Sequence, residues 1–299
     1  MKQLRANALL LLTAMIWGAA FVAQSVGMDY IGPFTFLASR SWLGGIVLLP
    51  VIFFREKRSS KKTDFSAAPA GDRKTLLIGG VCCGVVLFTA SILQQIGIQE
   101  TTAGKAGFIT AMYMVLVPIF GLFLKKRVSP RVWAAVVIAL VGMYFLCLFG
   151  TGESGINRGD LWEMACAVGF TFHILVIDHF SPRADGVKMS CIQFFVCAVI
   201  ATIFMLVLEQ PSVQSILDAA LPICYAGLLS SGAGYTLQIV AQKDTDPTVA
   251  SLLMSLESVF SLIFGWILLH EAMEPIELLG CGLIFAAVIL VQLPDRKAA

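Results

Sequence analysis

Glu257 is an acidic residue in the middle of an apolar run, residues 247–269, that is long enough to cross a membrane. A carboxylate at mid-bilayer costs about 2.5–3.5 kcal/mol even on the lenient insertion scale, so such residues usually mark a function. In a hydrated cavity, Glu257 can bind cargo or carry a coupling proton. Alternatively, it is a hydrogen-bonded residue that ties this run to the one at 103–124.

Tyr113 occupies the place of Glu257 in an earlier copy of the same pattern. Residues 103–149 and 247–293 align at an offset of about 144 positions, with one insertion. A phenol at that depth needs a partner for its hydroxyl. Tyr113 therefore either lines the same cavity as Glu257 or bonds a backbone carbonyl. A pattern that recurs half a chain later indicates a membrane protein built by duplication.

Amide and phenol side chains recur on the third and eighth apolar runs of the chain. Gln94 and Gln95 lie on the third run, and Tyr235 and Gln238 lie on the eighth, where Gln238 matches Gln94 at the same offset. Paired polar positions of this kind fit the two gates of an alternating-access carrier. Simple interhelical hydrogen bonds, worth about 0.6 kcal/mol each, explain them equally well.

Three ring-bearing residues complete the set of cargo or coupling candidates. Trp17 and Phe21 lie one turn apart at mid-depth in the first run, where they form either a flat apolar wall for organic cargo or ordinary packing. His173 lies in the sixth run. Since histidine titrates near neutral pH, it is a possible proton partner for Glu257; a satisfied core histidine is the alternative.

Arg40 and Glu163 are assigned a structural or gating role. Arg40 lies about two turns inside the predicted outer end of the second run. Its guanidinium can extend outward to the interface, or it can pair with Glu163 near the outer end of the sixth run. An anionic cargo would instead favour a binding role for Arg40.

The composition predicts an all-α integral membrane protein. The chain has 299 residues, of which 58% are hydrophobic and 13% are charged, against roughly 25% charged residues in a soluble domain. A spanning helix needs about 20 mostly apolar residues. Ten such stretches are present, near 6–26, 34–54, 76–98, 103–124, 132–149, 159–178, 188–208, 217–240, 247–269 and 276–293.

The basic residues predict the orientation of these ten spans. With the N-terminus inside, Lys105 and Arg158 are the only two of the 21 Lys and Arg residues outside, and Arg40 lies within a span. Since basic residues favour cytoplasmic loops, both termini are expected in the cytoplasm. Five spans per copy is an odd number, so the copies, 1–149 and 159–299, are inverted relative to each other. A cytoplasmic linker at 55–74 and an outer connection at 150–158 complete this plan.

The sequence lacks the motifs of several other protein classes. It contains no HExxH, GxSxG or GxxxxGK[ST] motif and no aspartate-rich metal motif, so neither an enzyme, a metal site nor ATP-driven pumping is expected. All eight cysteines fall inside predicted spans without a CxxC pair. They are interpreted as packing residues. No cofactor and no nucleic-acid partner are expected.

Nearly the whole chain resembles the EamA family of the drug/metabolite transporter superfamily. The resemblance rests on Ile16-Trp17-Gly18 with Phe21, on Arg40, on Leu256-Glu257-Ser258-Val259-Phe260, and on Leu268-Leu269-His270-Glu271 followed by Gly280. The chain departs from the family at Ser258, where a proline is usual, and at Tyr113. The superfamily carries amino acids, metabolites, drugs and nucleotide sugars, so the resemblance implies a process without naming the cargo. It also implies a midplane cavity between spans 1, 3, 4, 6, 8 and 9.

These observations predict a secondary transporter in the cytoplasmic membrane. It is expected to move a small organic metabolite, amino acid or drug-like molecule by alternating access, in the export direction and coupled to protons. An uncoupled facilitative permease and a flippase for a lipid-linked intermediate are the alternatives, and a membrane enzyme is the most distant one. The expected partners are this small molecule and the lipid bilayer, with the protein a monomer or homodimer.

Overall fold

The computed structural model describes residues 2–60, 73–101, 103–125, 128–147, 157–269 and 275–293, and every regular element within them is helical. The first half contains α1 (Lys2–Met28), α2 (Pro33–Ser60), α3 (Arg73–Ile98), α4 (Ala103–Thr110), α5 (Tyr113–Phe123) and α6 (Pro130–Cys147). The second half contains α7 (Arg158–Phe180), α8 (Gly186–Leu208), α9 (Val213–Asp218), α10 (Ala220–Cys224), the π-helix η1 (Tyr225–Tyr235), α11 (Thr236–Gln242), α12 (Pro247–Met254), α13 (Glu257–Leu269) and α14 (Pro275–Gln292). Most of the predicted linker and of the outer connection lies outside the described residues.

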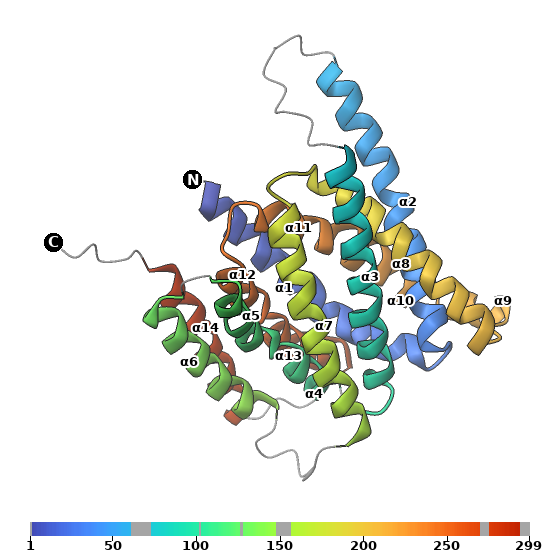
Figure 1. Cartoon of the computed structure of the whole chain (residues 1–299). Coiled ribbons are helices and arrows are strands. Elements are labelled where there is room, and N and C mark those ends of the chain that lie inside the picture. The colour runs from blue at the N-terminus through green and yellow to red at the C-terminus, as the bar shows by residue number, and fades with distance from the viewer. Residues whose placement is uncertain are drawn as a thin grey trace.

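Seven helical segments in the described part of the chain are long and apolar enough to cross a membrane. Two shorter apolar helices, α6 and α14, lie side by side at one edge of the bundle (Figure 1). Large apolar side chains cover the surface; Leu206 and Val207 of α8, for example, are 72% and 75% exposed. Such a surface suits lipid rather than water. The all-helical class is confirmed, whereas the number of ten spans stays a prediction.

The predicted span at 217–240 begins in the last residues of α9 and continues as three consecutive pieces, α10, η1 and α11. The middle piece is an 11-residue π-helix, a rare conformation that often occurs at functional sites. Small residues bring it close to α2, since a Cβ added at Gly44 would come within 2.6 Å of the Cβ of Ser231. A regular helix would be expected from the sequence, because glycine and serine in an apolar run indicate close packing without indicating a change of helical pitch.

Helices from the two halves of the chain pack against each other throughout the bundle. In the first half, α1 contacts α13, η1 and α11; in the second, α7 contacts α4, α5 and α3. The pairs α2 with α8 and α6 with α14 also join the two halves. Related helices thus make related contacts with the opposite half, as expected for two copies around a pseudo-twofold axis.

The pair α2 and α8 is held together at both ends. At the start of α2, the Glu209 carboxylate accepts hydrogen bonds from the backbone N–H of Phe34 at 2.9 Å and of Thr35 at 2.8 Å. Near the end of α2, two ion pairs join it to the start of α8. Nη2 of Arg55 lies 3.5 Å from Oδ2 of Asp185, and Nζ of Lys188 lies 2.5 Å from Oε1 of Glu56. An acidic group at a helix N-terminus satisfies free N–H groups and complements the helix dipole. These contacts fix the register of the two helices.

Candidate functional site

Two predicted spans are broken at matching positions near the centre of the molecule. The pieces α4 and α5 form one of them, and α12 and α13 form its counterpart. The breaks share their irregular hydrogen bonds: the N–H of Met112 bonds Ile109 three residues back, as the N–H of Leu256 bonds Leu253. The two patterns are 144 residues apart. Each break is a single tightened turn, since the span as a whole still runs as one helix, over Ala106–Phe123 and over Pro247–Leu268.

Tyr113 and Glu257 are the first residues after these two breaks, and they contact each other. The Tyr113 hydroxyl donates a hydrogen bond of 2.8 Å to Oε1 of Glu257. Each side chain is only 3% exposed. Glu257 is the first residue of α13. The partner of the Tyr113 hydroxyl is thus a carboxyl group, whereas the sequence left open a backbone carbonyl.

The pair lines a central cavity of about 20 Å³, together with most of the predicted candidates. Room of this size holds about one water molecule. The predicted residues around it are Trp17, Phe21, Arg40, Gln94, Tyr113, Tyr235 and Glu257. They come from spans 1, 3, 4, 8 and 9 of those that the resemblance implies, and also from the second span, which contributes Arg40; the sixth span reaches the cavity through Phe170 instead of a predicted residue. An amino acid does not fit in the cavity as it stands, so binding requires the helices to move apart.

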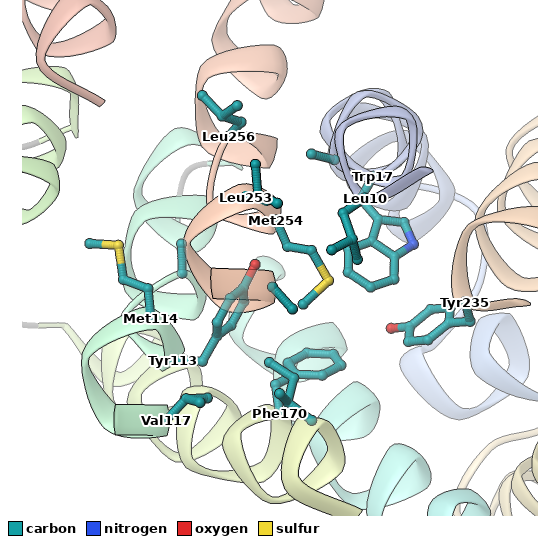
Figure 2. Packing of buried hydrophobic residues seen from close by; sticks show 14 of the residues in the cluster. Leu10, Trp17, Tyr113, Met114, Val117, Phe170, Tyr235, Leu253, Met254 and Leu256 are labelled. Carbon is teal, nitrogen blue, oxygen red and sulfur yellow. The ribbon is translucent and has the colours of Figure 1, made fainter. Parts of the chain in front are cut away.

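Aromatic rings form one wall of the cavity. Trp17 and Tyr235 have their ring centroids 4.6 Å apart, and Figure 2 shows them beside each other, with Tyr113 and Phe170 around the same central space. Trp17 comes from α1 and Tyr235 from the end of η1. This wall offers apolar contact area and a phenol to a bound molecule.

Arg40 is buried beside the cavity instead of extending to the interface. Its side chain is 3% exposed, and its Nη1 donates a hydrogen bond of 2.7 Å to Oε1 of Gln24 on α1. Of the two alternatives that the sequence left open, outward extension and pairing with Glu163, neither is seen among the described residues. Arg40 is held on the α1 side of the cavity, whereas Glu163 is held on the α4 side. The guanidinium keeps further N–H groups for another acceptor, because it has five donors in all.

Glu163 lies behind the cavity wall on α7. Its Oε2 accepts a hydrogen bond of 2.8 Å from the hydroxyl of Thr110, which also accepts one of 3.3 Å from Nε2 of Gln94. Thr110 and Gln94 line the cavity. Glu163 is therefore linked to the cavity through a single hydroxyl group.

Besides Glu163, three predicted residues are buried outside the cavity lining. Nε2 of His173 lies 3.1 Å from Oε1 of Gln193, whereas its Nδ1 has no hydrogen-bond partner among the described residues. Gln95 is fully buried, and its amide has no hydrogen-bond partner in the described part of the chain. Gln238 is also buried on α11. The structure thus brings the predicted residues together with these exceptions.

Five cavity residues are absent from the sequence prediction: Ala20, Gln24, Thr110, Phe170 and Ser230. Gln24 carried a usable signal, since it lies one turn beyond Phe21 and two turns from Trp17 on the same helix face. Thr110 lies three residues before Tyr113, which is about one turn in a regular helix. Phe170 and Ser230 resemble many other residues of their runs, so nothing local distinguishes them.

Comparison with known proteins identifies the relatives of this chain. A protein of Archaeoglobus fulgidus named as an uncharacterized transporter is 30% identical over 293 residues, covering 98% of this chain and 87% of the relative. The threonine/homoserine exporter RhtA of Escherichia coli K12 is 27% identical over 292 residues, covering 97% of this chain and 91% of the exporter. A solved crystal structure superposes with a TM-score of 0.76 at 18% identity, covering 96% of both chains.

The family model gives the same result as these relatives. It matches residues 4–148 and again residues 157–293, so nearly the whole chain consists of two copies of one family unit. The names of the relatives indicate a membrane transporter, in agreement with the apolar helices. The chain belongs to the EamA-like transporter family.

Proposed function

We propose that this protein exports a small zwitterionic molecule, an amino acid or a close analogue, across the cytoplasmic membrane. The observation that carries the proposal is the charge arrangement of the cavity, where the carboxyl group of Glu257 and the guanidinium of Arg40 line the same space. A zwitterion has an ammonium group that can bind Glu257 and a carboxylate that can bind Arg40. Charge-assisted hydrogen bonds of both kinds are the strong ones in protein sites.

The remaining cavity residues support a cargo with a short side chain. Gln24, Gln94 and Thr110 supply neutral polar groups, and Trp17, Phe21 and Phe170 supply apolar area. Since the cavity is only about 20 Å³, a small cargo demands the smallest expansion. The likeness to a threonine/homoserine exporter supports the same substrate class and the export direction.

The proposed transport cycle is alternating access between two inverted halves. Ten spans with both termini in the cytoplasm would place the Tyr113–Glu257 bond at the midplane, between the two broken helices. Opening on one side separates helices around the cavity, the cargo replaces the Tyr113 contact at Glu257, and closure on that side precedes opening on the other. The carboxyl group of Glu257 can hold either the ammonium of the cargo or a proton, which couples export to proton entry.

Transport in proteoliposomes tests this proposal. L-threonine, L-lysine, a polyamine and a nucleoside are offered to purified protein, with thermal stabilisation as a binding measurement and labelled-substrate flux as a transport measurement. L-threonine is expected to stabilise the protein and to move against its gradient when a pH difference is applied. Stabilisation by the nucleoside or the polyamine alone would contradict a zwitterion site. If a proton ionophore leaves the L-threonine flux unchanged, the protein carries out facilitated diffusion and not proton-coupled export.

A further inference from the structure

Glu163 is a second buried acid near the cavity, and cargo binding does not use it. The side chain is 0% exposed, and the hydroxyl of Thr110 bonds its Oε2. Its other oxygen, Oε1, has no hydrogen-bond partner among the described residues. An isolated ionised carboxylate is very costly to bury, far more than a neutral carboxylic acid. The carboxyl group of Glu163 is therefore much less costly to bury with a proton bound than without one.

The space around Oε1 excludes larger ligands. A Cβ added at Gly97 of α3 would lie 2.7 Å from this oxygen, so the carboxyl group is pressed against the glycine backbone. A metal ion requires several oxygen ligands around it, and an ammonium group requires a similar volume. A proton requires no additional volume, so it is the cation that fits.

Hydrogen-bonding groups connect Glu163 in two directions. Toward the cavity, the connection is the Thr110 hydroxyl. In the other direction, Asp160 lies one turn earlier on the same face of α7 and accepts a hydrogen bond of 2.9 Å from Oγ1 of Thr101. Thr101 follows the end of α3 and is partly exposed. Oxygen-bearing side chains thus lead from this end of the bundle to the cavity.

The titratable groups that face Glu163 are mainly acidic. They are Asp160 and Cys166 on its own helix and Glu257 on α13. Glu100, at the end of α3, lies against the neighbouring backbone of α7. The described side chains of α4 offer the Thr110 hydroxyl rather than a charge, and no Lys or Arg within the described residues forms an ion pair with Glu163.

We propose that Glu163 is a second proton-binding site of the transporter and exchanges protons with the cavity through Thr110. In each step Thr110 passes its hydroxyl proton to Oε2 of Glu163 and takes one from a protonated group in the cavity, either Glu257 or a hydronium ion. That donor becomes a carboxylate or a water molecule, and Glu163 becomes a carboxylic acid. The reverse step returns the proton. The coupling role rests on the proposed function, whereas proton binding at Glu163 does not.

Infrared difference spectroscopy tests the proton site without any substrate. Purified protein is compared between acidic and alkaline buffer, and the carbonyl stretch of a buried carboxylic acid is followed. In wild type, one carboxylic acid band is expected to disappear between acidic and alkaline buffer, and the Glu163→Gln protein should lack this band in both. Thr110→Val is expected to shift the band, because it removes the hydrogen bond from the Thr110 hydroxyl to Glu163. The matched control is Thr171→Val, because the Thr171 hydroxyl bonds the carbonyl of Ala167 on its own helix. Identical spectra for wild type, Glu163→Gln and Thr110→Val would overturn the proposal.

Transport of L-threonine then tests the coupling role. Each coupled proton contributes about a tenfold substrate gradient per pH unit, since a tenfold ratio corresponds to about 1.4 kcal/mol. Glu163→Gln should therefore lower the gradient reached by about tenfold per pH unit, while exchange of labelled for unlabelled L-threonine is retained. An unchanged gradient would overturn the coupling role. Absence of L-threonine transport in wild type would instead contradict the proposed function and leave the infrared result as it stands.

Discussion

The hydroxyl of Tyr113 donates a 2.8 Å hydrogen bond to the carboxylate of Glu257, the residue 144 positions later that corresponds to it in the second copy. A bond between corresponding residues requires both to lie next to the axis that relates the two halves. Two acids there would repel each other, and two phenols would leave the cavity without an acidic group opposite Arg40. Divergence of the copies has produced one donor and one acceptor at the place where the helices break.

Replacing Glu257 by Gln is expected to abolish pH-dependent transport. The amide keeps the size of the side chain and still accepts a hydrogen bond from Tyr113, but it carries neither a negative charge nor an exchangeable proton at transport pH. The same substitution should lower the affinity for L-threonine, because the ammonium group of the substrate loses its counter-charge. Flux across a series of pH values measures the effect. A Glu257→Gln protein with the wild-type pH profile would remove Glu257 as the coupling group.

Replacing Tyr113 by Phe is expected to destabilise the occluded cavity and leave Glu257 without its donor. Loss of one partner of a buried bond to a charged or acidic group costs about 1–3 kcal/mol. Thermal unfolding in detergent measures this loss. A double-mutant cycle with Glu257→Ala, which removes the acceptor that Gln would keep, isolates the pair: the two losses should not add, since residues in direct contact show coupling. Additive losses would indicate that the two side chains are not bonded in the protein.

Replacing Arg40 by Lys is expected to weaken substrate binding although the charge is retained. Lysine lacks the planar fork that allows arginine to bond Gln24 and a carboxylate at the same time. The apparent KM for L-threonine should rise by about tenfold, equivalent to about 1.4 kcal/mol. An amino alcohol without the carboxylate provides the control, because its binding should respond little. Equal loss for both molecules would assign Arg40 to structure alone.

The sequence predicts the helices and most of the cavity residues, but not the hydrogen-bond partners of those residues. Apolar length and the internal repeat indicate the helices, and the buried polar residues Glu257, Tyr113, Arg40 and Gln94 indicate the cavity, since burying such groups in lipid is costly. Periodicity places a side chain on a face without giving its partner. That is why the sequence allows Arg40 to pair with Glu163, while the packing of α1 against α2 gives it Gln24.

The departures from regular helix are the least predictable part. Neither Gly nor Pro lies at Ala111–Met112 or at Ser255–Leu256, where the two spans break, so the usual signals are missing. Both breaks lie where helices of the two halves pack against each other, α5 against α12 and α13 against α4. The same holds for η1, where close contact with α2 through Gly44 and Ser231 accompanies the wider helix. Tertiary contacts of this kind have no local pattern in the sequence.

Replacing Glu209 by Ala is expected to destabilise the start of α2. The carboxylate caps two backbone N–H groups and also accepts the hydroxyl of Thr35, so its loss should cost about 1–2 kcal/mol. Glu209→Gln keeps an acceptor and should recover part of this stability. Ser212→Ala is the matched control, because Ser212 caps only the short exposed helix α9. Unfolding midpoints for the three variants should decrease in the order Ser212→Ala, Glu209→Gln, Glu209→Ala.

Replacing Gly18 by Ala is expected to disturb the contact between α1 and α13, which carries Glu257. An added Cβ at Gly18 would collide with the Cβ of Phe260 and lie 2.8 Å from the backbone of that residue. A backbone cannot move aside as a flexible side chain can, and overpacking of this kind typically costs about 1–3 kcal/mol.

The same change at Gly282 provides the matched control. A Cβ added there meets nothing within 4 Å, and alanine favours a helix over glycine by up to about 1 kcal/mol. Gly282→Ala should therefore unfold at or above the wild-type temperature and transport normally. Gly18→Ala should unfold earlier and transport L-threonine more slowly, because displacement of α13 moves Glu257 away from Tyr113. A Gly18→Ala protein as stable and active as Gly282→Ala would contradict the close approach of α1 to α13 on which the geometry of the cavity depends.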